Sequence, residues 1–194
     1  MKPKKQKKGH VAYFFIFSVI ILFTACNNTP EFDDAYTRIT EGSLKPGDPI
    51  PLPAGEAILT VQGNIGAPNS GQEILMDLAT IESVGLVEYT VDDPFQQRSV
   101  TYRGVLMRDL LDLWQVPAEA TVLDTLALND YQIDVPIEPL RDTPVILAVQ
   151  ADGQYMPISE FGPMMFVFPY HQYEFERPLT ESYWVWQIQS INVK

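Results

Sequence analysis

Leu126-Ala-Leu-Asn-Asp-Tyr-Gln-Ile-Asp-Val-Pro136 is the stretch of sequence that decides the fold. Apolar and β-forming residues flank the pair Asn129-Asp130, and Asn and Asp both favour turns. The pattern therefore predicts two strands, Thr121–Leu128 and Tyr131–Val135, joined by a short turn. The other predicted elements extend outward from this pair.

Before these strands, apolar residues from Val105 to Trp114 occupy a wide face at helical spacing, and Pro117 prevents the helix from continuing. After them, a strand is predicted at Val145–Gln150, and Asp152-Gly153 is a strong hairpin signal. The remaining predicted elements are strands at Ala57–Gly63, Leu86–Val91 and Trp184–Val193 and a helix over Asp77–Val84. Strands outnumber the short helices without a repeating βαβ pattern, so the predicted class is α+β with a mixed, mainly antiparallel sheet.

The first 25 residues resemble a targeting segment. They contain five lysines and no acidic residue, and the apolar run Val11–Phe23 is shorter than the about 20 residues that a membrane span needs. Phe23-Thr-Ala-Cys26 resembles a bacterial lipobox, with Phe23 in place of the usual leucine. We expect residues 1–25 to be a lipoprotein signal peptide and Cys26 to be lipidated; the alternative is an uncleaved anchor helix. Either way the domain is expected at the cell envelope, attached to a membrane and facing the periplasm or the exterior.

Composition divides the rest of the chain. Residues 26–55 are polar and rich in proline, which predicts a flexible tether, and the folded domain is expected over 56–194. Beyond Ala25 the chain has 8 basic and 25 acidic residues, a net charge of −17. Such a surface repels phosphate backbones, so nucleic-acid binding is excluded. Cys26 is the single cysteine, so the domain after it offers no thiolate ligand or thiol nucleophile.

Several motifs occur in a fixed order after residue 100. They are Thr101-Tyr-Arg-Gly-Val-Leu-Met-Arg-Asp-Leu-Leu-Asp112, Ala127–Pro136, Val145-Ile-Leu-Ala148, Gly162-Pro163 and Trp186–Val193. In order and spacing they resemble the molybdopterin-binding domain of the sulfite oxidase family, in its short bacterial form. The resemblance spans about 57–193. It implies a pocket for an oxo-molybdenum pyranopterin and transfer of an oxygen atom to or from a small substrate.

The resemblance also suggests candidate site residues. Tyr131 stands where family enzymes place a tyrosine beside the metal-oxo group, although it could equally be an ordinary edge or core tyrosine. Asn129 and Asp130 are either polar groups of the pocket or simply the turn between two strands. His171 is the one histidine after Cys26 and could be structural; we expect it to share a groove with Tyr131 and Asn129. An anionic phosphate would need basic residues, and the candidates are Arg98, Arg103, Arg108, Arg141 and Arg177.

Two departures from the family pattern weigh on function. The resemblance implies a metal-ligating cysteine within Leu86–Gln97, where this chain has none, and Glu88 or Asp92 would be a poor substitute for that soft ligand. Near the C-terminus, Glu181 stands among residues where the family uses basic side chains to hold the pterin phosphate. Molybdopterin is therefore expected to be absent or bound without thiolate-ligated molybdenum.

Two functions follow from this reading. The first is a non-catalytic accessory lipoprotein that binds a small ligand or an envelope protein partner. The second is a molybdopterin-dependent oxidoreductase that transfers an oxygen atom. Serine-hydrolase, P-loop, dinucleotide-binding and zinc signatures are missing from the sequence.

Replacing the predicted lipidated residue tests the anchor. Cys26→Ser in the native host should leave unprocessed precursor and abolish incorporation of a fatty-acid probe, because the chain has no other thiol to acylate. Labelling and membrane fractionation measure both effects. Labelling that persists in the variant would contradict lipidation at this position.

Overall fold

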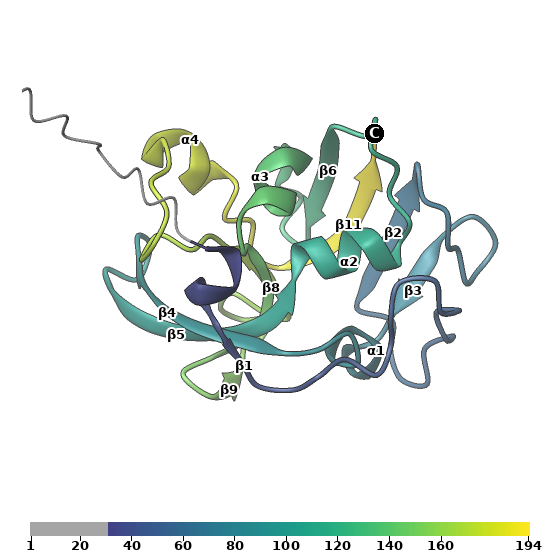
Figure 1. The fold of residues 1–194 in the computed structure, drawn as a ribbon, viewed down its shortest axis with the longest axis horizontal. Coiled ribbons are helices and arrows are strands. Elements are labelled where there is room, and N and C mark those ends of the chain that lie inside the picture. The colour runs from purple at the N-terminus through teal and green to yellow at the C-terminus, as the bar shows by residue number, and fades with distance from the viewer. Residues whose placement is uncertain (1–30) are drawn as a thin grey trace, which may run out of the picture.

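The computed structural model describes residues 31–194, which form two β-sheets and several short helices (Figure 1). One sheet has the order β1-β4-β5-β8-β10, with β9 paired to β8; the other has the order β3-β2-β11-β6-β7. Among the described strands only β2 and β11 pair in parallel. The predicted class, α+β with a mixed, mainly antiparallel sheet, is confirmed.

The element bounds are as follows. The first sheet contains β1 (Thr37–Arg38), β4 (Val87–Asp93), β5 (Arg98–Leu106), β8 (Ile146–Ala151), β9 (Gln154–Tyr155) and β10 (Met165–Val167). The second contains β2 (Leu59–Gly63), β3 (Ile74–Met76), β6 (Val122–Ala127), β7 (Gln132–Pro136) and β11 (Ile188–Val193). The helices are η1 (Phe32–Ala35), α1 (Leu78–Glu82), α2 (Met107–Leu113), α3 (Ile137–Asp142) and α4 (Arg177–Ser182).

Helix α2 links the two sheets within the core. It follows β5 without a break, and Leu110 is fully buried. At its C-terminal end Trp114 is also fully buried, and its indole N–H lies 3.4 Å from the sulfur of Met76 in β3. The apolar face predicted at helical spacing therefore lies in the core, with Leu110 and Trp114 both on it.

The helix predicted to start at Val105 starts two residues later. Val105 and Leu106 instead complete β5, where they pair with Leu147 and Ile146 of β8. The pairing register shifts just before Gly104, and a Cβ atom at this glycine would lie 2.1 Å from the carbonyl oxygen of Leu147. Only a residue without a side chain allows the two strands to approach so closely.

The last strand is shorter than predicted, and two helices were missed. Strand β11 begins at Ile188 rather than Trp184, because Gln187 adopts a positive φ of 57° that interrupts the extended backbone. Helices α3 and α4 are short and contain proline in their first turns, so they lack the long apolar period that predicts a helix. The predicted turn at Asp152-Gly153 is confirmed: it joins β8 to β9.

Residues 31–55 contact the domain instead of extending from it as a flexible tether. Strand β1 pairs with β4, and Leu44 and Ile50 are buried. Asp77 accepts hydrogen bonds from the backbone N–H groups of Ala54 and Gly55, each at 2.9 Å. The apolar residues of this segment are sparse and lie among prolines, so they gave no sequence period, yet Leu44 and Ile50 are buried against the domain. The signal peptide, Cys26 and the rest of the tether lie outside the described residues; within 31–194, none of the helices could cross a bilayer.

Truncating Leu110 tests the role of α2. Leu110→Ala should lower the free energy of unfolding by about 2–5 kcal/mol, because the methyl groups that it removes are fully buried. Urea denaturation measures the change, with Leu52→Ala as control because 64% of the Leu52 surface is exposed. Equal effects for the two variants would show that α2 does not contribute to the core.

The ionisation of Asp77 makes the free energy of unfolding depend on pH at acidic pH values. Its carboxylate accepts from the hydroxyl and N–H of Thr80 and from the two backbone N–H groups of Ala54 and Gly55. These bonds, the Thr80 hydroxyl first, lower the pKa of Asp77 to about 2. Because the folded-state pKa is depressed, this stabilisation is complete above the ordinary value of 3.8 and is lost as the pH falls towards 2.

Asp77→Asn should therefore destabilise the protein by about 1–3 kcal/mol at pH 7, since the amide NH₂ would face N–H donors. The difference from the parent should shrink between about pH 4 and pH 2. Urea denaturation across this range provides the measurement, with the exposed Asp142→Asn as control. A difference that stays constant with pH would disprove the assignment to the Asp77 charge.

Candidate functional site

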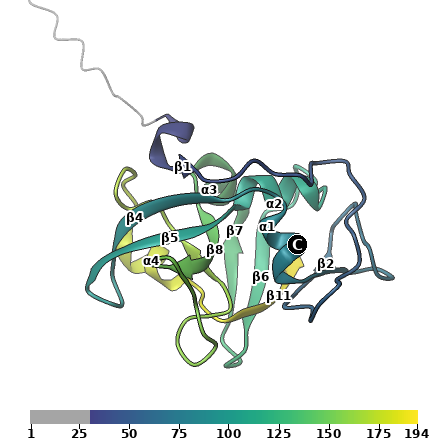
Figure 2. The same ribbon diagram turned by 90° about the horizontal axis from the view of Figure 1, so that it is seen from below.

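A pocket of about 220 Å³ lies where the tip of the β4–β5 hairpin meets the segment after α4. Figures 1 and 2 both place α4 beside this hairpin tip. We call it the aromatic pocket, and its lining residues are Phe95, Asn129, Tyr131, Glu181, Ser182, Trp184, Val185 and Trp186. They come from three separate segments of the chain, around residues 95, 129–131 and 181–186, so the pocket exists only once both sheets have assembled.

The rings of the pocket are inclined to one another and do not stack. The Phe95 ring is 5.0 Å from that of Trp186 at 75°, and 6.3 Å from that of Trp184 at 52°. Trp186 also meets Phe161 at 85° on another side. Edge-to-face contacts of this kind are favourable, and they hold the rings as walls that meet at an angle. Phe95 remains 40% exposed, so it lies at the mouth of the pocket.

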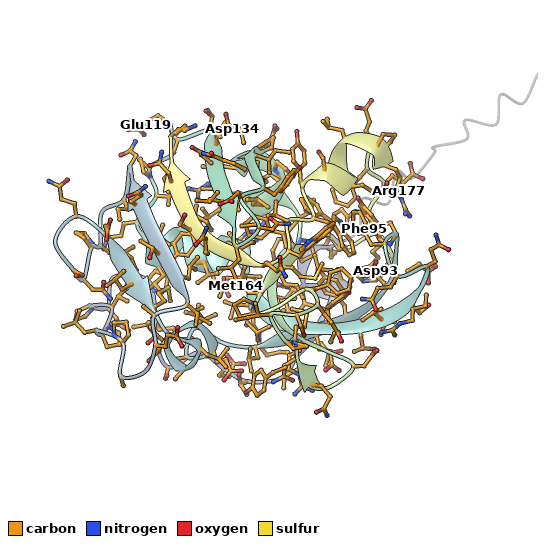
Figure 3. The ribbon with its side chains drawn as sticks, turned by 180° about the vertical axis from the view of Figure 1, so that it is seen from behind. Asp93, Phe95, Glu119, Asp134, Met164 and Arg177 are labelled. Atoms are coloured by element: carbon orange, nitrogen blue, oxygen red, sulfur yellow. The ribbon has the colours of Figure 1, made fainter. Side chains whose placement is uncertain are left out.

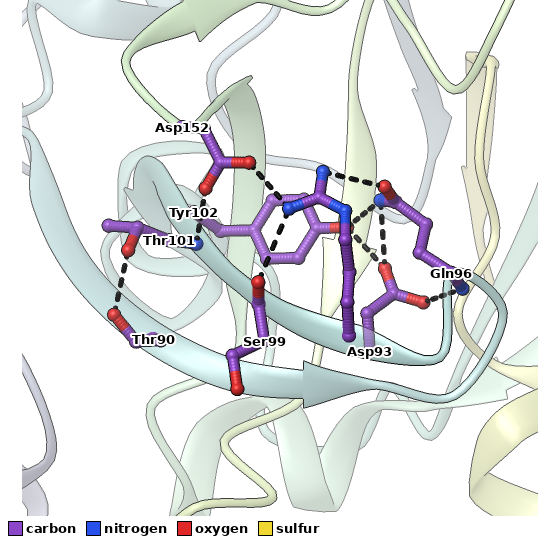
Figure 4. A network of polar contacts seen from close by, with 8 residues as sticks. Thr90, Asp93, Gln96, Ser99, Thr101, Tyr102 and Asp152 are labelled. Atoms are coloured by element: carbon purple, nitrogen blue, oxygen red, sulfur yellow. Dashed lines mark hydrogen bonds and ion pairs between the residues drawn. The ribbon is translucent and has the colours of Figure 1, made fainter.

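A buried carboxylate fixes the hairpin tip that carries Phe95 (Figure 4). Asp93 ends β4 with 2% of its surface exposed, and it accepts from the backbone N–H groups of Phe95 and Gln96, each at 2.7 Å. The Gln96 side-chain amide and the Tyr102 hydroxyl also donate to it. Burial, and then the bond to Asp93, raise the pKa of Tyr102 well above its ordinary value, so the hydroxyl keeps its proton and donates. In Figure 3, Asp93 and Phe95 lie next to each other at one end of the molecule.

An exposed ion pair extends the same network to the neighbouring turn. Arg98 contacts Asp152 at 2.7 Å and donates to the Gln96 side-chain oxygen at 2.9 Å. Asp152 in turn accepts from the N–H of Thr101 at 3.0 Å, and this bond, followed by Arg98, lowers the pKa of Asp152. Exposed pairs contribute little free energy. The consequence here is geometric, because the β8–β9 turn is joined to the β4–β5 hairpin.

The β6–β7 turn supplies the opposite rim of the pocket. Asn129 accepts from the backbone N–H of Tyr131 at 3.1 Å, and Asp130 has a φ of 65°, so both residues form the turn. Of the two, Asn129 also lines the pocket. The Tyr131 hydroxyl donates to the carbonyl oxygen of Ser182 at 3.2 Å, which connects the turn to the end of α4.

Arg103 and His171 lie elsewhere. Arg103 donates twice to Glu88, at 2.7 and 3.0 Å, across β4 and β5. His171 contacts the carbonyl oxygen of Ala35 at 2.8 Å and lies against Tyr89, with ring centroids 5.0 Å apart. Glu88 and His171 line a second, more polar pocket. The five predicted site residues are therefore not brought together, and the expected common groove of Tyr131, Asn129 and His171 is wrong.

The carboxylates of residues 86–97 are engaged within the protein. Glu88 pairs with Arg103, and Asp92 accepts a hydrogen bond from the Ser99 hydroxyl. Asp93 accepts the four hydrogen bonds described above. Among residues 31–194 no three His, Cys, Asp or Glu side chains are grouped as metal ligands. This segment does not fit a metal held by a soft protein ligand.

The five candidate arginines are engaged as well. Arg98, Arg103 and Arg141 pair with Asp152, Glu88 and Asp112. Arg108 donates to the carbonyl oxygen of Arg141 at 2.6 Å and lies over the Phe32 ring, and Arg177 lies over the Tyr170 ring. Binding an anionic pterin phosphate would require breaking several of these contacts. The residues present therefore do not fit the cofactor that the family resemblance implies.

Sequence reasoning missed most of the aromatic pocket. Trp184 and Trp186 were assigned to a continuous strand, in which alternate residues share one face. Phe95 was given no role, although an aromatic residue directly after Asp93-Pro94 was itself a signal. A second signal was that two of the three tryptophans, Trp184 and Trp186, lie within three residues of each other.

Comparison with known proteins identifies the fold alone. No family model matches the chain, and no curated protein matches it. Among solved structures, the sulfane dehydrogenase SoxCD from Paracoccus pantotrophus matches with a TM-score of 0.54 at 17% identity, over 74% of this chain. The match spans 39% of the SoxCD chain. This likeness supports a fold related to the one predicted by resemblance to the sulfite oxidase family.

Proposed function

We propose that this protein is a non-catalytic envelope lipoprotein that uses an oxidoreductase-type fold to bind a small ligand or a protein partner. The observation that carries the proposal is the pairing of charges described above. Of the five candidate arginines that an anionic metal cofactor would need, three are held in ion pairs and two lie over aromatic rings, whereas the aromatic pocket is already formed. A formed apolar pocket with a few polar groups at its rim is the usual character of a small-molecule site.

The fold and the function are separable in this proposal. SoxCD is by name a dehydrogenase, and the shared fold supports an oxidoreductase-like framework. The same framework can host unrelated sites, because the site consists of a few side chains placed on it. Here those side chains are aromatic.

The proposed anchor places the pocket at the envelope. Lipidation at Cys26 would attach the domain to a membrane, and two acyl chains give stable anchoring where one does not. The ligand or partner would then be met outside the cytoplasm.

The alternative is a molybdopterin-dependent oxidoreductase with oxygen-atom transfer to or from a small substrate. Two observations favour it: the likeness to a dehydrogenase, and the place of Tyr131 on the wall of a pocket. Under this alternative Tyr131 would be the first residue to replace.

Metal and pterin analysis distinguishes the two functions. Protein purified from its native host should contain molybdenum far below one atom per chain and release no fluorescent pterin, because residues 31–194 contain no cysteine and the candidate arginines are engaged. A molybdoenzyme purified from the same cells serves as control that the cofactor is being made. Near-stoichiometric molybdenum with pterin would overturn the proposal.

A further inference from the structure

We propose that the aromatic pocket recognises an organic cation, specifically a quaternary or fully alkylated ammonium group. This inference rests on the proposed function, because it assumes that the protein acts by binding a ligand in the aromatic pocket and not through a metal cofactor. It adds the chemical class of the ligand.

The walls of the pocket suit a cation. Four aromatic residues line it, namely Phe95, Tyr131, Trp184 and Trp186. The π-face of an aromatic ring attracts a cation, most strongly for tryptophan, and several rings at steep angles can surround one charge. Trp184 is only 1% exposed, so a cation would mainly meet Phe95, Tyr131 and Trp186, and the Phe95 and Trp186 rings are inclined at 75° to each other.

The charges at the pocket have the matching sign. Glu181 is the one charged side chain among the lining residues, and the part of the chain beyond Ala25 has a net charge of −17. An anionic ligand would meet the Glu181 carboxylate at the rim and a negative long-range field outside it. Both effects attract a cation, and the long-range field also raises its rate of association.

The nearest arginine on α4 does not remove this preference. Arg177 lies over the Tyr170 ring, 4.1 Å from its centroid, and is not among the residues that line the pocket. The Tyr170 ring itself lies 5.3 Å from the Trp184 ring, centroid to centroid. A protein cation is thus already held by an aromatic ring next to the pocket.

The hydrogen bonds at the rim favour an alkylated cation over a primary ammonium. The Tyr131 hydroxyl is bound to Ser182, and the Asn129 side-chain oxygen accepts from the backbone of Tyr131. A primary ammonium brings three N–H donors; the Glu181 carboxylate can accept from it, but each donor left buried without an acceptor is costly. A quaternary ammonium has no N–H donor and loses nothing in this respect.

The volume of the pocket limits the ligand. A cavity of about 220 Å³ corresponds to roughly seven water molecules at about 30 Å³ each. It is below the usual range of about 300–1,000 Å³ for drug-sized ligands. The pocket therefore holds a small headgroup, either a free ion or the end of a longer molecule.

Calorimetric titration of the full-length lipidated protein in a non-ionic detergent tests the inference. The probes are choline chloride and tetramethylammonium chloride, with 3,3-dimethylbutan-1-ol as the neutral analogue of choline and sodium chloride to match the ionic strength. Tryptophan fluorescence gives a second readout, because two of the three tryptophans line the pocket. We expect saturable binding of both cations and at least tenfold weaker binding of the neutral alcohol.

Variants separate charge from shape. Glu181→Gln should weaken choline binding about three- to tenfold while leaving the neutral alcohol unchanged, and Trp186→Leu should weaken it at least tenfold. Trp186→Phe keeps a ring and should restore most of the affinity. Glu119→Gln is the matched control, because it removes the same charge at an exposed position well away from Phe95 of the pocket (Figure 3) and should have no effect. Thermal unfolding of each variant shows that it is folded.

Three results would overturn the cation inference: no binding of either cation, equal binding of choline and its neutral analogue, or equal effects of Glu181→Gln and Glu119→Gln. Equal binding of the neutral analogue would leave the proposed ligand-binding function intact. That function fails instead on the molybdenum and pterin analysis, so the two outcomes are distinguishable.

Discussion

A buried carboxylate must be fully hydrogen-bonded or it destabilises the fold, and Asp93 imposes this constraint at the tip of the longest hairpin. Its two oxygens are satisfied by two backbone N–H groups of the turn, by Gln96 and by Tyr102. These hydrogen bonds hold the hairpin turn in one conformation and so position Phe95. The Phe95 ring then lies at the mouth of the aromatic pocket, against the two tryptophans. The aromatic pocket thus depends on a polar network of Asp93, Gln96 and Tyr102, none of which lines it.

The two sheets and the pocket are governed by different interactions. The sheets are held by buried apolar residues and by the close approach of β5 and β8 at Gly104, which tolerates no side chain. The pocket is assembled outside the strands, from two hairpin turns, the end of α4 and the segment after it. The ion pair of Arg103 with Glu88 illustrates the difference, because it joins two strands and leaves neither charge available to a ligand. A fold related to that of an oxidoreductase can therefore persist while the chemistry at its edge changes.

The sequence predicted what depends on local patterns. Alternating apolar residues located β6 and β7, and Asp152-Gly153 located the β8–β9 turn, because both signals lie within a few consecutive residues. It misplaced the start of α2, since the run Val105-Leu106-Met107 is equally apolar as strand or helix and only pairing with β8 decides between them. It could not assemble the pocket, whose residues are up to about ninety positions apart and meet only through the packing of α4 and the two hairpins. The grouping of His171 with Tyr131 was wrong for the same reason: the sequence does not show which distant segments meet in the folded protein.

Reversal of charge at one position accounts for the proposed change of ligand. Glu181 stands where resemblance to the sulfite oxidase family would place basic residues for a pterin phosphate, and it lines the pocket. Replacing a cation by a carboxylate at a rim turns attraction for anions into repulsion without altering the core, since the rim is solvated and tolerates either charge. Trp184, by contrast, is 1% exposed and packs on both Tyr102 and Tyr170, so it serves the core and the pocket together. The aromatic walls are constrained by folding, whereas the sign of the charge beside them is not, and under the proposed function that sign selects the ligand.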